Sequence, residues 1–280
     1  MIQPLFWPRF RQDRLAVASL LLIAALLLIA IFGDVIAPYA HDLQNTDNNL
    51  AAPNAQHWMG TDALGRDLFS RLIYGTRISM AVSLLTGVSA LLLGTCYGAV
   101  SGYAGGRIDN AMMRGVDVLY AIPDLLLIIL ITVLIGRGVS GVFLALSLVG
   151  WITVARLIRG EVLRLKENAY VEAARAFGVK DVRILLKHIL PNTFGVLIVT
   201  LTFRIPSAIL AESTLSFIGL GLTPPAASWG TLANEGWKAL KFYPHLIFFP
   251  GLAIFMTMLA FNFLGDGLRD ALDPKQNKVS

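Results

Sequence analysis

The sequence predicts an all-α integral membrane protein with six transmembrane helices. Of its 280 residues, 56% are hydrophobic and 15% are charged, whereas soluble domains contain about 25% charged residues. Long runs with at most one charged residue recur along the chain. A helix of about 20 apolar residues crosses a hydrocarbon core of about 30 Å. The predicted spans are 15–33, 78–106, 118–136, 138–155, 192–211 and 242–265.

The first span follows three arginines, as the apolar segment of a secretion signal would. Its apolar stretch is longer than the ~7–15 residues usual in a signal peptide, and no A-x-A site follows it, so we expect a retained helix. The chain then divides into 1–77 (an N-terminal tail, the first span and an external loop), 78–268 (a core of five spans with a cytoplasmic loop, 156–191) and 269–280 (a C-terminal tail).

The second span carries small residues at strict four-residue intervals. Residues four apart lie on one helical face, and small residues there allow the backbone of another helix to approach closely. We therefore expect this face to pack against protein. The ladder consists of Ala90, Gly94, Gly98, Gly102 and Gly106.

The third span contains Asp124, and Asp117 lies seven residues before it. Two membrane aspartates are also what an intramembrane aspartyl protease requires. The G-x-G-D pattern of such enzymes is incomplete, because residues 263–266 read Phe-Leu-Gly-Asp. We therefore expect Asp117 and Asp124 to mark the cytoplasmic end of the third span.

Residues 156–191 form a long connection with a helical pattern, and long ordered loops usually carry function. Asn168 is placed to cap a short helix over 169–177, which Gly178 can end in the left-handed conformation. Val182, Leu185, Leu186 and Ile189 then recur at helical spacing until Pro191. By itself this pattern fits either a groove on a partner protein or an anionic lipid surface.

Residues 213–234 are also free of charge and are long enough to span the membrane. Pro224 and Pro225 remove two backbone donors and break the run into pieces that are too short to cross. We expect a re-entrant or surface-lying segment. With six spans, the loops on the side of both termini hold sixteen Lys and Arg against six on the other side, which places both termini in the cytoplasm.

Several motifs resemble those of one membrane protein family. Glu172-Ala173-Ala174, then Gly178 and Leu190-Pro191, is similar to the EAA motif of ATP-binding-cassette (ABC) importer permeases with the type I fold. His188 departs from the aliphatic residue common at its position. Residues 60–67, 74–79, 212–221 and 265–274 resemble the dipeptide, oligopeptide and nickel branch, the last two resembling the second of its two permeases.

The resemblance implies a permease fold with a cytoplasmic coupling helix that docks into an ATPase subunit. The implied coupling residues are Tyr170, Val171, Glu172, Ala173, Ala174, Arg175, Phe177, Gly178, Leu190 and Pro191. The chain lacks G-x-x-x-x-G-K-[ST], so ATP and Mg²⁺ are expected on a separate subunit and no cofactor on this one. The implied assembly is heteromeric: a homologous second permease, two ABC ATPases and an extracytoplasmic solute-binding protein in the bacterial cytoplasmic (inner) membrane.

Arg204 lies within the fifth span, where an arginine at a helix centre costs roughly 2.5–3.5 kcal/mol unless it faces protein or water. We therefore expect it, together with Glu212, in the translocation pathway, or else against a partner. Two interpretations stay open: Arg204 binds the carboxylate or backbone of a passing peptide, or it forms a structural pair with Glu212 or with the other permease.

The external residues Asp62, Arg66 and Asp67 suggest either a docking surface for the binding protein or a structural lid over the pore. The four histidines have none of the short spacings of a metal site, and the basic residues lie in loops, so neither a metal nor a nucleic acid is expected. The sequence thus predicts a non-enzymatic permease subunit for oligopeptides or dipeptides. A nickel permease of the same branch and a proton-coupled secondary transporter are the alternatives.

Overall fold

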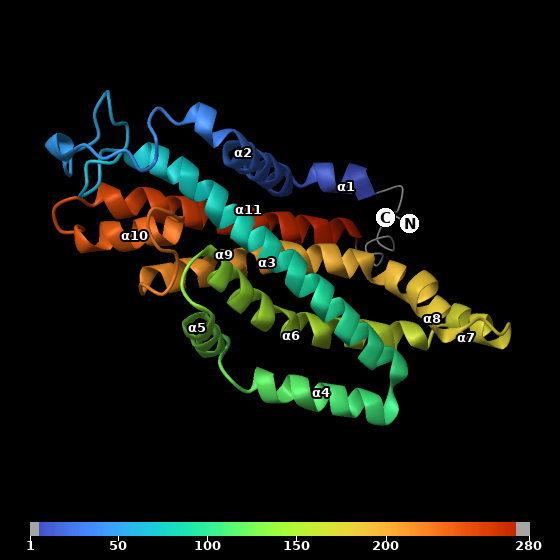
Figure 1. Cartoon of the computed structure of the whole chain (residues 1–280). Coiled ribbons are helices and arrows are strands. Elements are labelled where there is room, and N and C mark those ends of the chain that lie inside the picture. Colours follow the sequence, from blue (N-terminus) through green and yellow to red (C-terminus); the bar gives the residue numbers. More distant parts are fainter. Residues whose placement is uncertain (1–5, 273–280) are drawn as a thin grey trace.

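The structure, a computed structural model, describes residues 6–272 and consists of helices and loops, without a β-strand in that range (Figure 1). The predicted all-α class is therefore confirmed. The elements are α1 (Phe6–Gln12), α2 (Arg14–Ile36), η1 (Thr46–Asn48), α3 (Leu68–Ala104), α4 (Gly106–Tyr120), α5 (Asp124–Ile135), α6 (Val139–Lys166), α7 (Ala169–Ala176), α8 (Asp181–Ile184), a π-helical turn (Leu185–Ile189), a 3-10 turn (Leu190–Thr193), α9 (Phe194–Phe217), α10 (Trp229–Lys238) and α11 (His245–Leu272).

Five helical stretches are long and apolar enough to cross a membrane: α2, α3, α6, the stretch that ends with α9, and α11. The bent pair α4–α5 makes a sixth if it is counted as one span. These six correspond to the six predicted spans. Residues 213–234 do not form one helix, because α9 ends at Phe217 and α10 begins only at Trp229.

The third span is not the straight helix over 118–136 that the sequence predicts. Helix α4 begins at Gly106, and α5 leaves it at an angle of 85° across a break before Asp124. Pro123 occupies the N-cap position of α5, where it lacks a backbone donor and disfavours a helical conformation in Ile122. The proline therefore divides the span into two helices.

The long helices form an elongated bundle with two distinct ends (Figure 1). Helix α3 lies along α6 and also contacts α9, while α11 contacts α2, α9 and α10. One end carries residues 37–67 and α10 and is called the loop end below; the other carries residues 167–193 and is called the α7 end. Asp13 caps α2 and Asp67 caps α3 through side chains that accept from backbone N–H groups, which helps to set where these helices begin.

Candidate functional site

Helix α7 is a short helix at the far end of the bundle, close to the predicted bounds 169–177. Gly178 follows it with φ at 75°, and its N–H donates to the Arg175 carbonyl at 2.9 Å. The predicted side-chain cap is wrong, because Asn168 occupies the N-cap position without a side-chain bond to the helix. Its carbonyl instead accepts from Val171 N–H at 2.9 Å. The backbone alone therefore closes the first turn.

The two faces of α7 differ sharply in exposure. Val171 is fully buried in a cluster that includes Ile158 and Val162 of α6. Phe177 is 88% exposed and Tyr170 is 42% exposed. Glu172, Ala173 and Arg175 are also exposed, and Ala174 is half-buried. The helix is thus anchored through one side and presents an aromatic, slim surface on the other.

The chain around α7 is also tied to the end of α3. The Tyr103 hydroxyl donates to the Asp181 carboxylate at 2.6 Å, and Lys166 Nζ donates to the Tyr103 carbonyl at 2.6 Å. The Arg175 guanidinium lies over the Tyr103 ring, 5.8 Å from its centroid. A displacement of α7 would therefore act on both α3 and α6.

Residues 181–193 do not form the single amphipathic helix that their spacing predicts. The π-helical turn at 185–189 changes the residue period, so Ile184 and Ile189 are buried while Val182 and Leu186 are exposed. Pro191 then lies in the first part of the 3-10 turn, where its missing donor costs little. Leu190 is half-buried and Pro191 is exposed at the start of the path into α9.

The glycine ladder of α3 lies against α6. A Cβ atom on Gly94 would come within 2.5 Å of Val154 Cβ, and one on Gly102 within 2.9 Å of the Arg159 carbonyl. Gly98 faces the Ala155 carbonyl still more closely. Gly106 is the exception: α3 has already ended, and a Cβ there would meet nothing within 4 Å. The ladder therefore holds two long helices at backbone contact.

Arg204 lines a cavity of about 360 Å³ between α3, α5, α6 and α9. Its Nη2 donates to the Gly150 carbonyl of α6 at 2.5 Å. Asp124 lines the same cavity. Because Gly150 and Arg204 lie near the middle of their helices, Asp124 lies at mid-length of the bundle and not at the end of the span, where the sequence places it.

Glu212 lies apart from this cavity. It is fully buried, and Ser216 Oγ donates to its Oε1 at 2.8 Å. Ser228 caps α10, and its Oγ lies 3.5 Å from Ser216 Oγ. The Trp229 N–H donates to Ser79 Oγ of α3 at 3.2 Å. Within residues 6–272, Glu212 and Arg204 do not pair. Glu212 instead belongs to a polar contact between α9 and α10.

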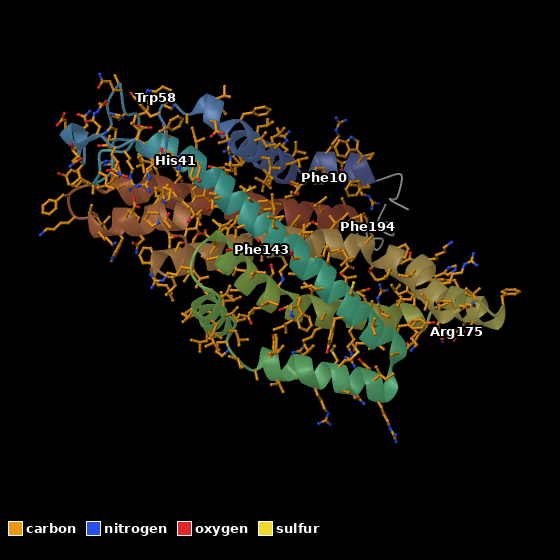
Figure 2. The ribbon with its side chains drawn as sticks, viewed as in Figure 1. Phe10, His41, Trp58, Phe143, Arg175 and Phe194 are labelled. Atoms are coloured by element: carbon orange, nitrogen blue, oxygen red, sulfur yellow. The ribbon has the colours of Figure 1, made fainter. Side chains whose placement is uncertain are left out.

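Some charged residues of the loop end are buried together with Arg71, near the start of α3. Asp62 accepts from Arg66 Nε at 2.7 Å and from Arg71 Nη1 at 2.5 Å. Glu235 of α10 accepts from the same two arginines. Asp67 bonds His57 Nδ1 at 2.9 Å while it caps α3. Around them Trp58, labelled in Figure 2, and Leu64 are exposed.

Sequence reasoning did not identify Glu235 or Asp109, and it did not place Asp124 in one cavity with Arg204. Glu235 joins α10 to the loop end, Asp109 binds Arg159 through two 2.6 Å bonds, and Asp124 faces the cavity of Arg204. The ion-pair partners lie 50 or more residues apart in the chain. No spacing rule connects such pairs, although a charge inside a predicted span was a usable signal for Asp124.

Comparison with known proteins places the chain in one family. Residues 69–278 match the family model described as binding-protein-dependent transport system inner membrane component, and residues 5–53 match the N-terminal TM domain of oligopeptide transport permease C.

Relatives match over almost the whole chain. The oligopeptide transport system permease protein OppC of Bacillus subtilis (strain 168) is 46% identical over 96% of this chain and 88% of its own length. The dipeptide transport system permease protein DppC of the same strain is 47% identical over 96% of this chain and 84% of its own length. The glutathione transport system permease protein GsiD of Escherichia coli O6:K15:H31 is 44% identical over 96% of this chain and 89% of its own length.

Among solved structures, an inward-facing conformation of the MetNI methionine ABC transporter shares the fold with a TM-score of 0.61. At 16% identity it covers 74% of this chain and 96% of that one. Together with the two family models, the six candidate spans and the type I fold, these matches show that the chain belongs to the binding-protein-dependent transport system inner membrane component family and is a multi-pass membrane permease.

Proposed function

We propose that this chain forms half of the translocation pore of an ATP-driven importer for oligopeptides or dipeptides. A homologous second permease, two ABC ATPases and an extracytoplasmic solute-binding protein complete the assembly. ATP and Mg²⁺ act on the ATPase subunits, and this chain carries no cofactor of its own. Both termini lie in the cytoplasm of a bacterial cell, as the charge distribution favours.

The proposal rests mainly on how α7 is packed. Val171 anchors the helix in the cluster with α6, while Tyr170 and Phe177 are exposed. An exposed aromatic surface on a short, slim helix suits a groove on another protein. The names of the relatives, two of which concern peptides, support the substrate class.

In the proposed mechanism, closure of the ATPase pair moves α7. The buried Val171 and the bonds of Tyr103 transmit that displacement to α6 and α3, which the glycine ladder holds at backbone contact. Because packed helices have discrete arrangements, the two permeases rock between an inward-facing and an outward-facing state.

We propose that the binding protein docks on the loop end, at the region of Asp62, Arg66 and Asp67. Asp62 and Asp67 are only 4% and 3% exposed, so they would act by holding the loop in shape. Neighbouring exposed side chains such as Trp58 and Leu64 would make the contact.

Reconstituted proteoliposomes test the function. The complex that copurifies with the tagged chain is inserted with its binding protein outside and ATP inside, and uptake of a labelled dipeptide and a labelled oligopeptide is measured. We expect accumulation that requires hydrolysable ATP. Accumulation of Ni²⁺ without peptide would point to the nickel alternative. Uptake by this chain alone, driven by a pH gradient, would contradict the proposal in favour of a secondary transporter.

A further inference from the structure

The cavity shared by α3, α5, α6 and α9 has two opposite charges in a lining that is otherwise mostly apolar. Arg204 is half-buried on α9, and Asp124 is exposed at the first position of α5. The remaining lining is mostly aliphatic, with the hydroxyls of Thr86, Ser207 and Thr214 as its other side-chain polar groups. Ionisable groups at this depth are costly in a membrane and usually serve function.

The two charges do not neutralise each other directly. Among residues 6–272, Arg204 and Asp124 form no ion pair within 4 Å, and the acceptor that the guanidinium contacts is the Gly150 carbonyl. A guanidinium has five N–H donors in a planar fork that can bind a carboxylate through two bonds. Donors of Arg204 and the Asp124 carboxylate therefore remain for a ligand that carries charges of both signs.

The backbone around the cavity has the form expected of a transport site. Asp124 begins a helix directly after an 85° break in its span. Transporters commonly bind substrate near the bilayer midplane where a transmembrane helix is interrupted. The volume of about 360 Å³ lies in the lower part of the range for small-molecule sites, about 300–1,000 Å³.

We propose that Arg204 and Asp124 form a subsite for a short zwitterionic peptide during its passage through the pore. Arg204 binds the terminal carboxylate, and Asp124 binds the terminal ammonium group. The aliphatic lining accepts side chains without selecting among them. This inference rests on the proposed function and names residues that would recognise the substrate within this chain.

The test is uptake by proteoliposomes that contain the complete transporter with its unchanged binding protein. Three probes are compared: a dipeptide with free ends, its N-acetylated form and its C-amidated form. We expect Arg204→Gln to reduce the preference for the free over the amidated peptide about tenfold, which is the effect of losing one hydrogen bond to a charged group. Asp124→Asn should reduce the preference for the free over the acetylated peptide to a similar degree.

Controls separate recognition from assembly. Arg156 Nη1 and Asp117 Oδ1 lie 3.6 Å apart in an exposed ion pair outside this cavity. Asp117→Asn and Arg156→Gln should therefore leave both preferences unchanged. Arg204→Lys keeps the charge and should retain most of the preference for a free carboxylate. Copurification of the partner subunits should match the wild type in Arg204→Gln and Asp124→Asn.

Three results are distinguishable. If both variants transport the three peptides in wild-type ratios, the binding protein alone selects the termini and the subsite does not exist. If Arg204→Gln and Asp124→Asn lose the second permease during purification, the two charges are contacts between permeases, and the inference is wrong. If the wild-type complex accumulates no peptide with ATP, the proposed function itself fails.

Discussion

At the loop end of the bundle Arg71 is 2% exposed and contacts two carboxylates, whereas at the α7 end Phe177 is 88% exposed (Figure 2 labels Trp58 and Arg175 at these two ends). Residues 37–67 contain one short 3-10 turn, yet side chains such as Asp62 accept several of their backbone N–H groups. Residues 167–193 are mostly helical and leave much apolar surface uncovered. Buried charges are paired at the loop end, whereas the α7 end leaves aromatic residues exposed.

The largest expected effect comes from breaking the ion pairs of the loop end. Arg71→Met leaves the buried Asp62 carboxylate with less compensation, and breaking a buried pair costs about 3–5 kcal/mol. We expect a loss of this size in the free energy of unfolding, measured by denaturant titration of the purified chain in detergent. Arg77→Met is the matched control, because Arg77 pairs with an exposed Asp34 and such pairs are worth under ~1 kcal/mol. Equal losses in the two variants would mean that the loop end is not held by its buried charges.

An intermediate effect separates the two faces of α7. Val171→Ala removes buried methyl groups and should lower the free energy of unfolding by about 2 kcal/mol. Phe177→Ala should leave stability within about 0.5 kcal/mol, as exposed substitutions do, but should abolish copurification with the ATPase subunits. The same titration and a pull-down from the coexpressed complex provide both measurements. A stable Phe177→Ala complex with wild-type ATP-driven uptake would show that this exposed surface is not the docking face.

The smallest effect concerns the end of α7. Gly178 has φ at 75° with no atom near a Cβ position, so Gly178→Ala meets only the backbone cost of the left-handed conformation, about 1–2 kcal/mol. Gly160→Ala in α6 is the control: a Cβ there also meets nothing, but the residue lies in a helix interior, so the change should be neutral or stabilising by up to about 1 kcal/mol. Hydrogen exchange of the α7 amides should rise in the first variant only. Unchanged exchange would indicate that packing of Val171, and not the glycine, sets where the helix ends.

Helical segments were predictable where one local rule acts alone. Gly178 ends a helix of the expected length, and residues 213–234 break into pieces around Pro224 and Pro225. The wrong predictions concern segments in which two local preferences conflict. Pro123 lies in an apolar run, so hydrophobic length indicated a straight span although the proline bends it. The π-helical turn at 185–189 likewise altered which residues of an apparently periodic segment are buried.

The candidate site was only partly accessible from the sequence. A charge within an apolar run marked Arg204 and Asp124 individually, but their common cavity depends on how α5 leaves α4. Glu212 was predicted to lie with Arg204 in the translocation pathway or to pair with it. The structure separates them, because Arg204 faces the cavity and Glu212 the buried contact with α10. Position along a chain does not specify the face of a helix that a distant segment will cover.

The sequence by itself determined that the chain lies in a membrane, its all-α class, its six apolar segments and the short helix at 169–177. These features follow from hydrophobic length, proline and glycine, which act through local energies. Only the tertiary structure decided which charges of the loop end are buried together, that Arg204 meets Gly150 and shares a cavity with Asp124, and that Phe177 stays uncovered. The bonds of Arg71 with Glu235 and of Arg204 with Gly150 join residues 164 and 54 positions apart, and the energies of such contacts exist only once the helices have packed.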